Sequence, residues 1–147
     1  MYQDLSFMKI PLPEDVLKLK NYGDYAGAQK MIRYFLEHKE IPKALRKRLE
    51  IEQEIIGVMG ADEYPYTYAE ALEMMTSHLR DFKEEELQYL KEIGAADWIY
   101  IDGEVHFQRL FYDNLTQTRP DLAARVIVQN EELEKENAMK QKLLNGN

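Results

Sequence analysis

Cysteine is absent from the 147-residue sequence. The chain therefore has no disulfide framework, no cysteine-ligated zinc and no thiol nucleophile. Serine is also scarce, because only Ser6 and Ser77 occur and neither stands in the Gly-x-Ser-x-Gly setting of a hydrolase nucleophile. A glycine-rich phosphate loop and a His-Glu-x-x-His motif are missing too. The sequence therefore argues against catalysis by this chain and predicts no cofactor.

Long apolar runs are a second absence. No stretch approaches the roughly 20 apolar residues that cross a bilayer, and the opening MYQDLSFMKI lacks the basic and apolar regions of a secretory signal. Glycine (7) and proline (5) are few, whereas 45% of the residues are hydrophobic, which is typical of a globular chain. We therefore expect a soluble, cytoplasmic protein that does not bind membranes.

Positive charge is scarce in the middle of the chain. The formal net charge is −8, and residues 61–104 hold 3 basic and 12 acidic residues, whereas residues 1–60 hold 10 and 9. Nucleic-acid binding requires a cationic face, so this distribution predicts a protein that does not bind nucleic acid.

Helix signals dominate what is present. Pro13 can open a short helix, Asp24 can cap a second to about Lys39, and Pro42 can begin a third that Gly60 ends. Two capping-box patterns, Thr67 with Glu70 and Asp81 with Glu84, predict the next two helices, the second ending at Gly94. Further helices are expected over residues 108–115 and from Pro120 onward.

The period changes at residues 98–107. Trp98-Ile99-Tyr100-Ile101 and Glu104-Val105-His106-Phe107 flank Asp102-Gly103, a strong signal for a hairpin with a tight primed turn. The sequence therefore predicts a mainly α fold, a compact bundle of about six or seven helices with one β-hairpin at about residues 98–107. We expect a single domain over residues 1–128 and a polar helical tail or linker over residues 129–147.

Four aromatic residues are candidates for protein contact. Tyr64 and Tyr66 flank Pro65, and Trp98 and Tyr100 open the hairpin. Exposed, such side chains combine a large contact area with a polar handle. The alternative, which the sequence favours, is that they fill the interface between the hairpin and the helices.

A metal site is a weaker alternative. Asp102, Glu104 and His106 lie close together in sequence, but the turn requires Asp102 and no second ligand cluster accompanies them. His38 and His78 fall within expected helices and are better explained as surface residues. The sequence therefore predicts no metal site.

Two known arrangements resemble parts of the chain. GDYAGAQKMIRYFLE resembles the second helix of a tetratricopeptide repeat, but no copy recurs about 34 residues away, so a simple helical hairpin explains it better. The helices and hairpin between Pro42 and Phe107 resemble a winged helix. The candidate recognition helix, KEEELQYLKEIG, is acidic, so a winged-helix regulator acting through protein contacts is a better alternative than a DNA reader.

Several longer blocks resemble one family. They are LSFMKIPLPEDVLKLKNYGDYAGAQKMI, IPKALRKRLEIEQEI, YPYTYAEALEMM and ADWIYIDGEVHFQRLFYDNLTQTRPDLAAR. Together, from about Leu5 to Arg125, they resemble the amino-terminal region of bacterial transglutaminase-like proteins, whose chemistry belongs to a later papain-like core with a Cys, His and Asp triad.

The resemblance implies a non-catalytic accessory domain, because the chain lacks the cysteine that the family's chemistry needs. Its implied partner is a catalytic transglutaminase-like region in cis, or another protein. A helical scaffold that dimerises through the tail ranks last, because the apolar tail positions Leu133, Met139, Leu143 and Leu144 do not sustain three heptads. The sequence leaves the oligomeric state open.

Overall fold

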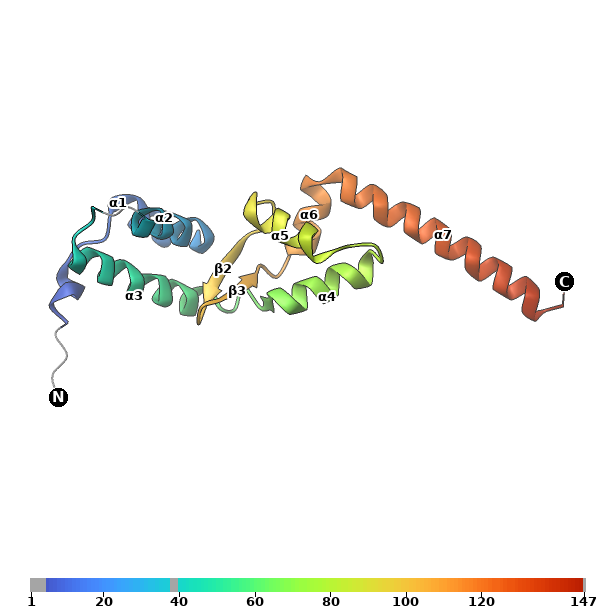
Figure 1. Cartoon of the computed structure of the whole chain (residues 1–147), viewed down its shortest axis with the longest axis horizontal. Coiled ribbons are helices and arrows are strands. Elements are labelled where there is room, and N and C mark those ends of the chain that lie inside the picture. Colours follow the sequence, from blue (N-terminus) through green and yellow to red (C-terminus); the bar gives the residue numbers. More distant parts are fainter. Residues whose placement is uncertain (1–4, 38–39, 147) are drawn as a thin grey trace. The chain divides into compact units, whose positions relative to one another are not determined.

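The structure, a computed structural model, describes residues 5–37 and 40–146. These residues confirm the mainly α fold (Figure 1). A short 3₁₀ helix, η1 (Ser6–Lys9), precedes seven α-helices: α1 (Glu14–Asn21), α2 (Tyr25–Glu37), α3 (Lys43–Gly60), α4 (Tyr68–His78), α5 (Glu84–Glu92), α6 (Phe111–Thr118) and α7 (Pro120–Leu144). The strands are β1 (Tyr66–Thr67), β2 (Trp98–Ile101) and β3 (Glu104–Phe107).

The chain divides into two compact units. The first unit comprises the residues up to Tyr68 together with Asp97–Arg109, so it holds η1, α1 to α3 and the sheet. The second unit comprises Ala69–Ala96 and the residues from Leu110 onward, so it holds α5 to α7 and nearly all of α4. Helix α7 continues without a break across residue 128.

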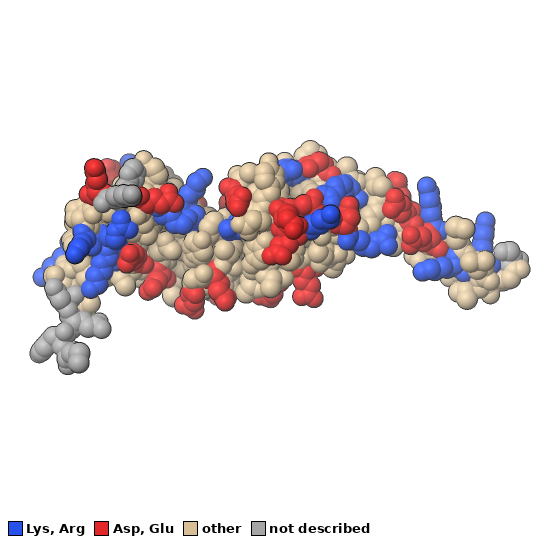
Figure 2. All heavy atoms as spheres, in the orientation of Figure 1, with Lys and Arg blue, Asp and Glu red and all other residues tan. Residues whose placement is uncertain are grey.

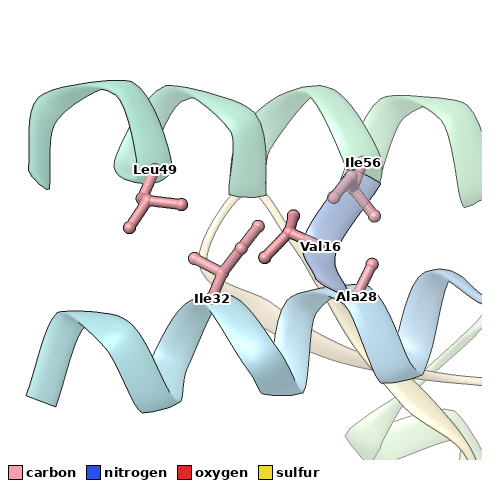
Figure 3. Close-up of a cluster of buried hydrophobic side chains, with 5 residues drawn as sticks. All are labelled: Val16, Ala28, Ile32, Leu49 and Ile56. Carbon is pink, nitrogen blue, oxygen red and sulfur yellow. The ribbon is translucent and has the colours of Figure 1, made fainter. Parts of the chain in front are cut away.

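The core of the first unit lies between α1, α2 and α3. Five side chains from these helices are fully buried and point toward one another (Figure 3). They are Val16, Ala28, Ile32, Leu49 and Ile56. Burying a Val, Leu or Ile side chain contributes about 1.5–3 kcal/mol, so this cluster is a main source of the unit's stability.

The predicted starts of α1, α2 and α3 agree with the structure to within a residue. Pro13 and Pro42 occupy the N-cap positions of α1 and α3. The Asp24 carboxylate accepts a hydrogen bond from the Gly27 N–H at 2.9 Å, which is the predicted cap of α2. Helix α2 ends at Glu37, and the predicted end at Lys39 lies outside the described residues, as does His38.

The hairpin forms where the sequence predicts it. Ile101 pairs with Glu104 and Trp98 with Phe107, so β2 and β3 are joined by a two-residue loop. Asp102 has φ 52° and Gly103 has φ 76°, the two positive values that a type I′ turn requires. Strand β1 pairs antiparallel with β3 and completes a sheet of order β1-β3-β2, which the sequence did not predict.

Buried apolar side chains also fill the second unit. They are Ala71, Met75, Leu79, Phe82, Leu87, Leu90, Ala96, Phe111, Leu115 and Leu122.

A polar contact joins α7 to the end of α4 within this unit. The side-chain amide of Gln129 on α7 donates to the His78 carbonyl at 2.8 Å and accepts from the Arg80 N–H at 2.5 Å.

The predicted start of α5 is wrong. The helix begins at Glu84 with Lys83 as N-cap, and the Lys83 N–H donates to the Glu86 carboxylate at 3.0 Å. Asp81 instead forms an ion pair with Arg125 at 3.1 Å. The predicted stop is confirmed, because Gly94 has φ 73° and Ala95 N–H donates to the Leu90 carbonyl, which is a Schellman end.

Helix α6 begins at Phe111, three residues later than predicted, and runs to Thr118. Helix α7 begins at Pro120 as predicted and carries the proline in its first turn. In the described part of the chain, no helix combines the length and apolarity that a membrane span requires.

Candidate binding surface on the sheet

The sheet brings three of the four predicted contact residues onto one face. Tyr66 and Trp98 both pair with Phe107, from opposite sides of the central strand. Directly paired residues share a face, and so do residues two apart on one strand, which adds Tyr100. The rings of Trp98 and Tyr100 meet edge to face with centroids 5.0 Å apart. Tyr66, Trp98 and Tyr100 are each partly exposed, and we call them the aromatic face.

Arg33 of α2 lies over this aromatic face. Its guanidinium carbon is 4.4 Å from the Trp98 ring centroid and 5.4 Å from that of Tyr100. A guanidinium at this distance from an indole is attracted by the ring's electron-rich face, an interaction that grows when water is excluded. Arginine, tryptophan and tyrosine therefore form one partly buried cluster.

Gln29, one helical turn before Arg33, fixes α2 against the sheet. Its side-chain oxygen accepts the Tyr100 N–H at 2.7 Å, and its side-chain nitrogen donates to the Tyr100 carbonyl at 3.0 Å. Gln29 is fully buried and also donates to the Gln53 carbonyl at 3.0 Å. These bonds occupy backbone groups of β2 that face away from β3, so the edge of the sheet is closed at this point.

Helix α3 packs closely against β2 at Gly57. A Cβ atom placed on Gly57 would lie 2.5 Å from the Tyr100 carbonyl oxygen, so only glycine allows this approach. The backbone of Tyr100 is therefore held by α2 and α3 together. The position of the aromatic face follows from the helix packing and does not depend on a flexible loop.

The guanidinium of Arg33 is incompletely satisfied within the described structure. Its Nη1 atom is buried and has no hydrogen-bond partner there. Burial lowers the pKa of Arg33 below its usual value, and the nearby Tyr100 and Glu37 offset part of this effect. A buried donor without an acceptor costs about 1–3 kcal/mol.

Tyr64 does not belong to the aromatic face. Only 4% of the residue is exposed, and its N–H donates to the Gly60 carbonyl at the end of α3. Burial raises the pKa of its phenol, and the charges of Asp97, Asp24 and Glu63 raise it further. Tyr64 is therefore a neutral, buried side chain of the first unit.

The other face of the hairpin carries the residues considered for a metal. Glu104 and His106 share this face with the fully buried Ile99, and the positive φ of Asp102 places it in the turn. The Nδ1 atom of His106 is buried without a hydrogen-bond partner in the described structure. Within residues 5–37 and 40–146, no group of three or more His, Cys, Asp or Glu side chains could hold a metal ion.

His78 lies at the end of α4, in the second unit. Its ring stacks on that of Tyr112 with centroids 4.2 Å apart, and its backbone carbonyl accepts from Gln129. This contact packs α4 against α6. His78 is therefore explained by its packing contacts in the fold.

Sequence reasoning missed Gln29 and Arg33, the two residues that position and cover the aromatic face. Both lie in a helix whose apolar stripe explains its packing without them. The available signal was their spacing of four residues, which places both side chains on one side of α2. A polar pair at this spacing is common on solvent-facing helices, so it identified neither residue.

The chain matches no protein-family model, no curated protein and no solved structure.

Proposed function

We propose that this chain is a non-catalytic protein-interaction domain that binds its partner through the aromatic face of the sheet. One observation carries the proposal. The first unit gathers Tyr66, Trp98 and Tyr100 on a single face and stacks Arg33 across two of them. Tyrosine, tryptophan and arginine are the residues that most often dominate the energy of protein interfaces.

The partner must offer apolar or aromatic surface to these partly exposed rings, which would exclude water on binding. Because Gln29 and Gly57 hold β2 in place, binding would order few side chains and cost little conformational entropy.

The resemblance of the sequence to transglutaminase-like proteins supplies the candidate partner. In this proposal the chain positions or regulates a transglutaminase-like catalytic region, in cis or as a separate protein. The missing cysteine supports an accessory role, because the chemistry of that family depends on a cysteine.

Two measurements test this function. The purified chain should give no amidase or transamidase turnover with model glutamine substrates, and turnover that follows the purified chain would contradict the proposal. Calorimetric titration with a purified transglutaminase-like catalytic region of the same organism should give saturable binding. The Tyr100→Ala variant should weaken that binding by about tenfold or more, as expected for an interface hot spot.

A winged-helix regulator is the alternative. The order of elements from α3 to β3, with a three-stranded sheet completed by β1, favours it. These elements are divided between the two units, so element order is the only support. The exposed acidic residues Glu84, Glu85 and Glu92 on α5 would repel phosphates. A salt-sensitive gel shift with duplex DNA would favour the alternative.

A further inference from the structure

The second half of α3 carries apolar side chains on a side that the core does not use. Val58 is 74% exposed and Met59 is 46% exposed, and Ile51 and Ile55 are partly exposed. Single exposed apolar side chains are common on protein surfaces, whereas a contiguous group marks an interaction site. Whether these four residues form one surface depends on their spacing along the helix.

The four residues form one continuous stripe. The other three follow Ile51 by four, seven and eight positions, and each position turns the helix by about 100°, so all four lie within an arc of about 100°. The charged residues of the same segment, Glu52 and Glu54, fall outside this arc, and Glu52 is turned into the core. The arc is therefore apolar throughout, and we call it the α3 stripe.

The neighbours of α3 in the first unit pack on other parts of the helix. Lys47 Nζ lies 4.5 Å from the centroid of the Phe7 ring, so η1 packs on the first half of α3. Ile56 belongs to the core with α1 and α2, and Gly57 adjoins the Tyr100 carbonyl of β2. The α3 stripe therefore lies at the surface of the unit.

Acidic side chains line one border of the α3 stripe. Glu50 and Glu54 are exposed, lie one helical turn apart and, in the described part of the chain, form no ion pair. The cations at the other border, Lys20 and Arg48, are both engaged by the buried Glu52 carboxylate at 2.6 Å. The charge available to a partner is therefore negative and lies along one border.

The hairpin turn extends the acidic border. A Cβ atom on Gly57 would lie 3.4 Å from the last Cα atom of β2, so the turn that follows lies beside α3, and Asp102 and Glu104 there are exposed. Arg109 donates to the Asp62 carbonyl at 2.7 Å and offsets part of the charge at the end of α3. Figure 2 shows blue basic atoms near the start of α3 and red acidic atoms toward its end and the hairpin.

We infer that the α3 stripe binds an amphipathic helix of a partner protein that carries lysine or arginine along one edge of its apolar side. Packed helices lie about 8–10 Å apart, so the basic side chains can reach Glu50 and Glu54 while the apolar ones cover Val58 and Met59. The flexible methionine adapts to the shape of such a partner. The inference uses a different surface from the aromatic face and does not depend on the proposed function.

Fluorescence anisotropy with a labelled probe peptide tests the inference. The probe is a synthetic amphipathic helix of about 18 residues with leucine on its apolar side and lysine along the edges, and a second peptide has glutamate in place of each lysine. The full-length chain should bind the lysine peptide saturably, with an affinity that falls as salt is added, and the glutamate peptide at least about tenfold more weakly. Absence of binding to the lysine peptide, or equal binding of both peptides, would overturn the inference.

Neutral polar substitutions test the location. Val58→Gln with Met59→Gln should weaken binding of the lysine peptide by at least about tenfold, because amide groups would enter an apolar contact. Ile127→Gln with Val128→Gln changes two adjacent exposed apolar residues of α7 and should leave the affinity unchanged. Equal effects of the two pairs would overturn the inference. So would a wild-type chain that sediments as a dimer and a Val58→Gln, Met59→Gln variant that sediments as a monomer, because a second copy would then cover the stripe.

Charge reversal tests the complementarity. Glu50→Lys with Glu54→Lys should weaken binding of the lysine peptide by at least about tenfold and strengthen binding of the glutamate peptide. Glu131→Lys with Glu134→Lys changes the net charge by the same amount at exposed positions of α7 and should leave both affinities unchanged. Circular dichroism should confirm unchanged helix content in both variants. Equal affinities of the two variants for the lysine peptide would mean that net charge alone acts, and would overturn the inference.

Discussion

The side chain of Gln29 and the backbone of Tyr100 form a closed pair of hydrogen bonds, with the Tyr100 N–H donated at 2.7 Å and its carbonyl accepting at 3.0 Å. The carboxamide thus takes the place that a further strand would occupy beside β2. Through this pair, one helical residue fixes the edge of the sheet and the strand that carries Trp98.

Gln29→Leu should destabilise the protein by about 2–4 kcal/mol, because two buried backbone groups of Tyr100 would lose their partners. Urea denaturation followed by circular dichroism measures the change. Lys30→Ala, at the exposed neighbouring position, is the control and should change stability by no more than about 0.5 kcal/mol. Equal stability of the Gln29→Leu and Lys30→Ala variants would show that the pair is dispensable.

Gly57→Ala should destabilise the protein by about 1–3 kcal/mol, although alanine is the better helix former by about 1 kcal/mol. The added methyl group would lie 2.5 Å from the Tyr100 carbonyl oxygen and force α3 away from β2. Thermal unfolding measures the effect. Val58→Ala, at the 74% exposed next position, should leave the midpoint nearly unchanged.

Glu52 is a buried carboxylate whose stability contribution should depend on pH. Its side chain is 1% exposed and lies 2.6 Å from Lys20 Nζ and 2.6 Å from Arg48 Nη1. Burial alone raises the pKa of Glu52, but the hydrogen bonds and charges of Lys20 and Arg48 outweigh it and lower the pKa below its usual 4.5. The contribution is therefore present above about pH 4.5 and is lost as the pH falls through the lower folded pKa.

Glu52→Gln should accordingly cost about 3 kcal/mol at pH 7 and flatten the fall of stability below about pH 4.5. Urea denaturation at several pH values gives both quantities. Glu54→Gln, on the exposed side of α3, is the control and should keep the wild-type pH profile. An unchanged slope in the Glu52→Gln variant would mean that another carboxyl is responsible.

Arg33→Ala should expose the Trp98 ring to water, because the guanidinium that covers it at 4.4 Å is removed. Trp98 is the single tryptophan of the chain, so its emission reports on this site alone. We expect a red shift and stronger quenching by acrylamide. Identical spectra for the wild type and the Arg33→Ala variant would contradict the stacking, and Lys30→Ala provides the matched control.

The sequence predicted the features that depend on local backbone chemistry. The Asp102-Gly103 turn, the Asp24 cap and the Gly94 stop all follow from conformations that few residue types adopt, and all three are confirmed. The start of α5 was predicted wrongly because Asp81 has the right spacing for a cap but is engaged by Arg125 from α7. Ion pairs with a distant helix leave no local pattern.

The candidate site was only partly predictable for a related reason. Tyr66, Trp98 and Tyr100 were recognised by residue type, and their common face follows from the register that β1 adds. A two-residue strand is too short to show an alternating pattern, so β1 was missed. Tyr64 has the same residue type as Tyr66 but is buried, which depends on tertiary packing at the end of α3.

The most direct test of the proposed function is a titration of the chain with a purified transglutaminase-like catalytic region, followed by Trp98 emission. The account predicts a saturable change in emission, and an affinity reduced at least about tenfold in the Tyr66→Ala and Tyr100→Ala variants. Tyr22→Ala, at a 90% exposed tyrosine of the same unit, should bind like the wild type. Unchanged Trp98 emission, or equal affinities for all three variants, would contradict it.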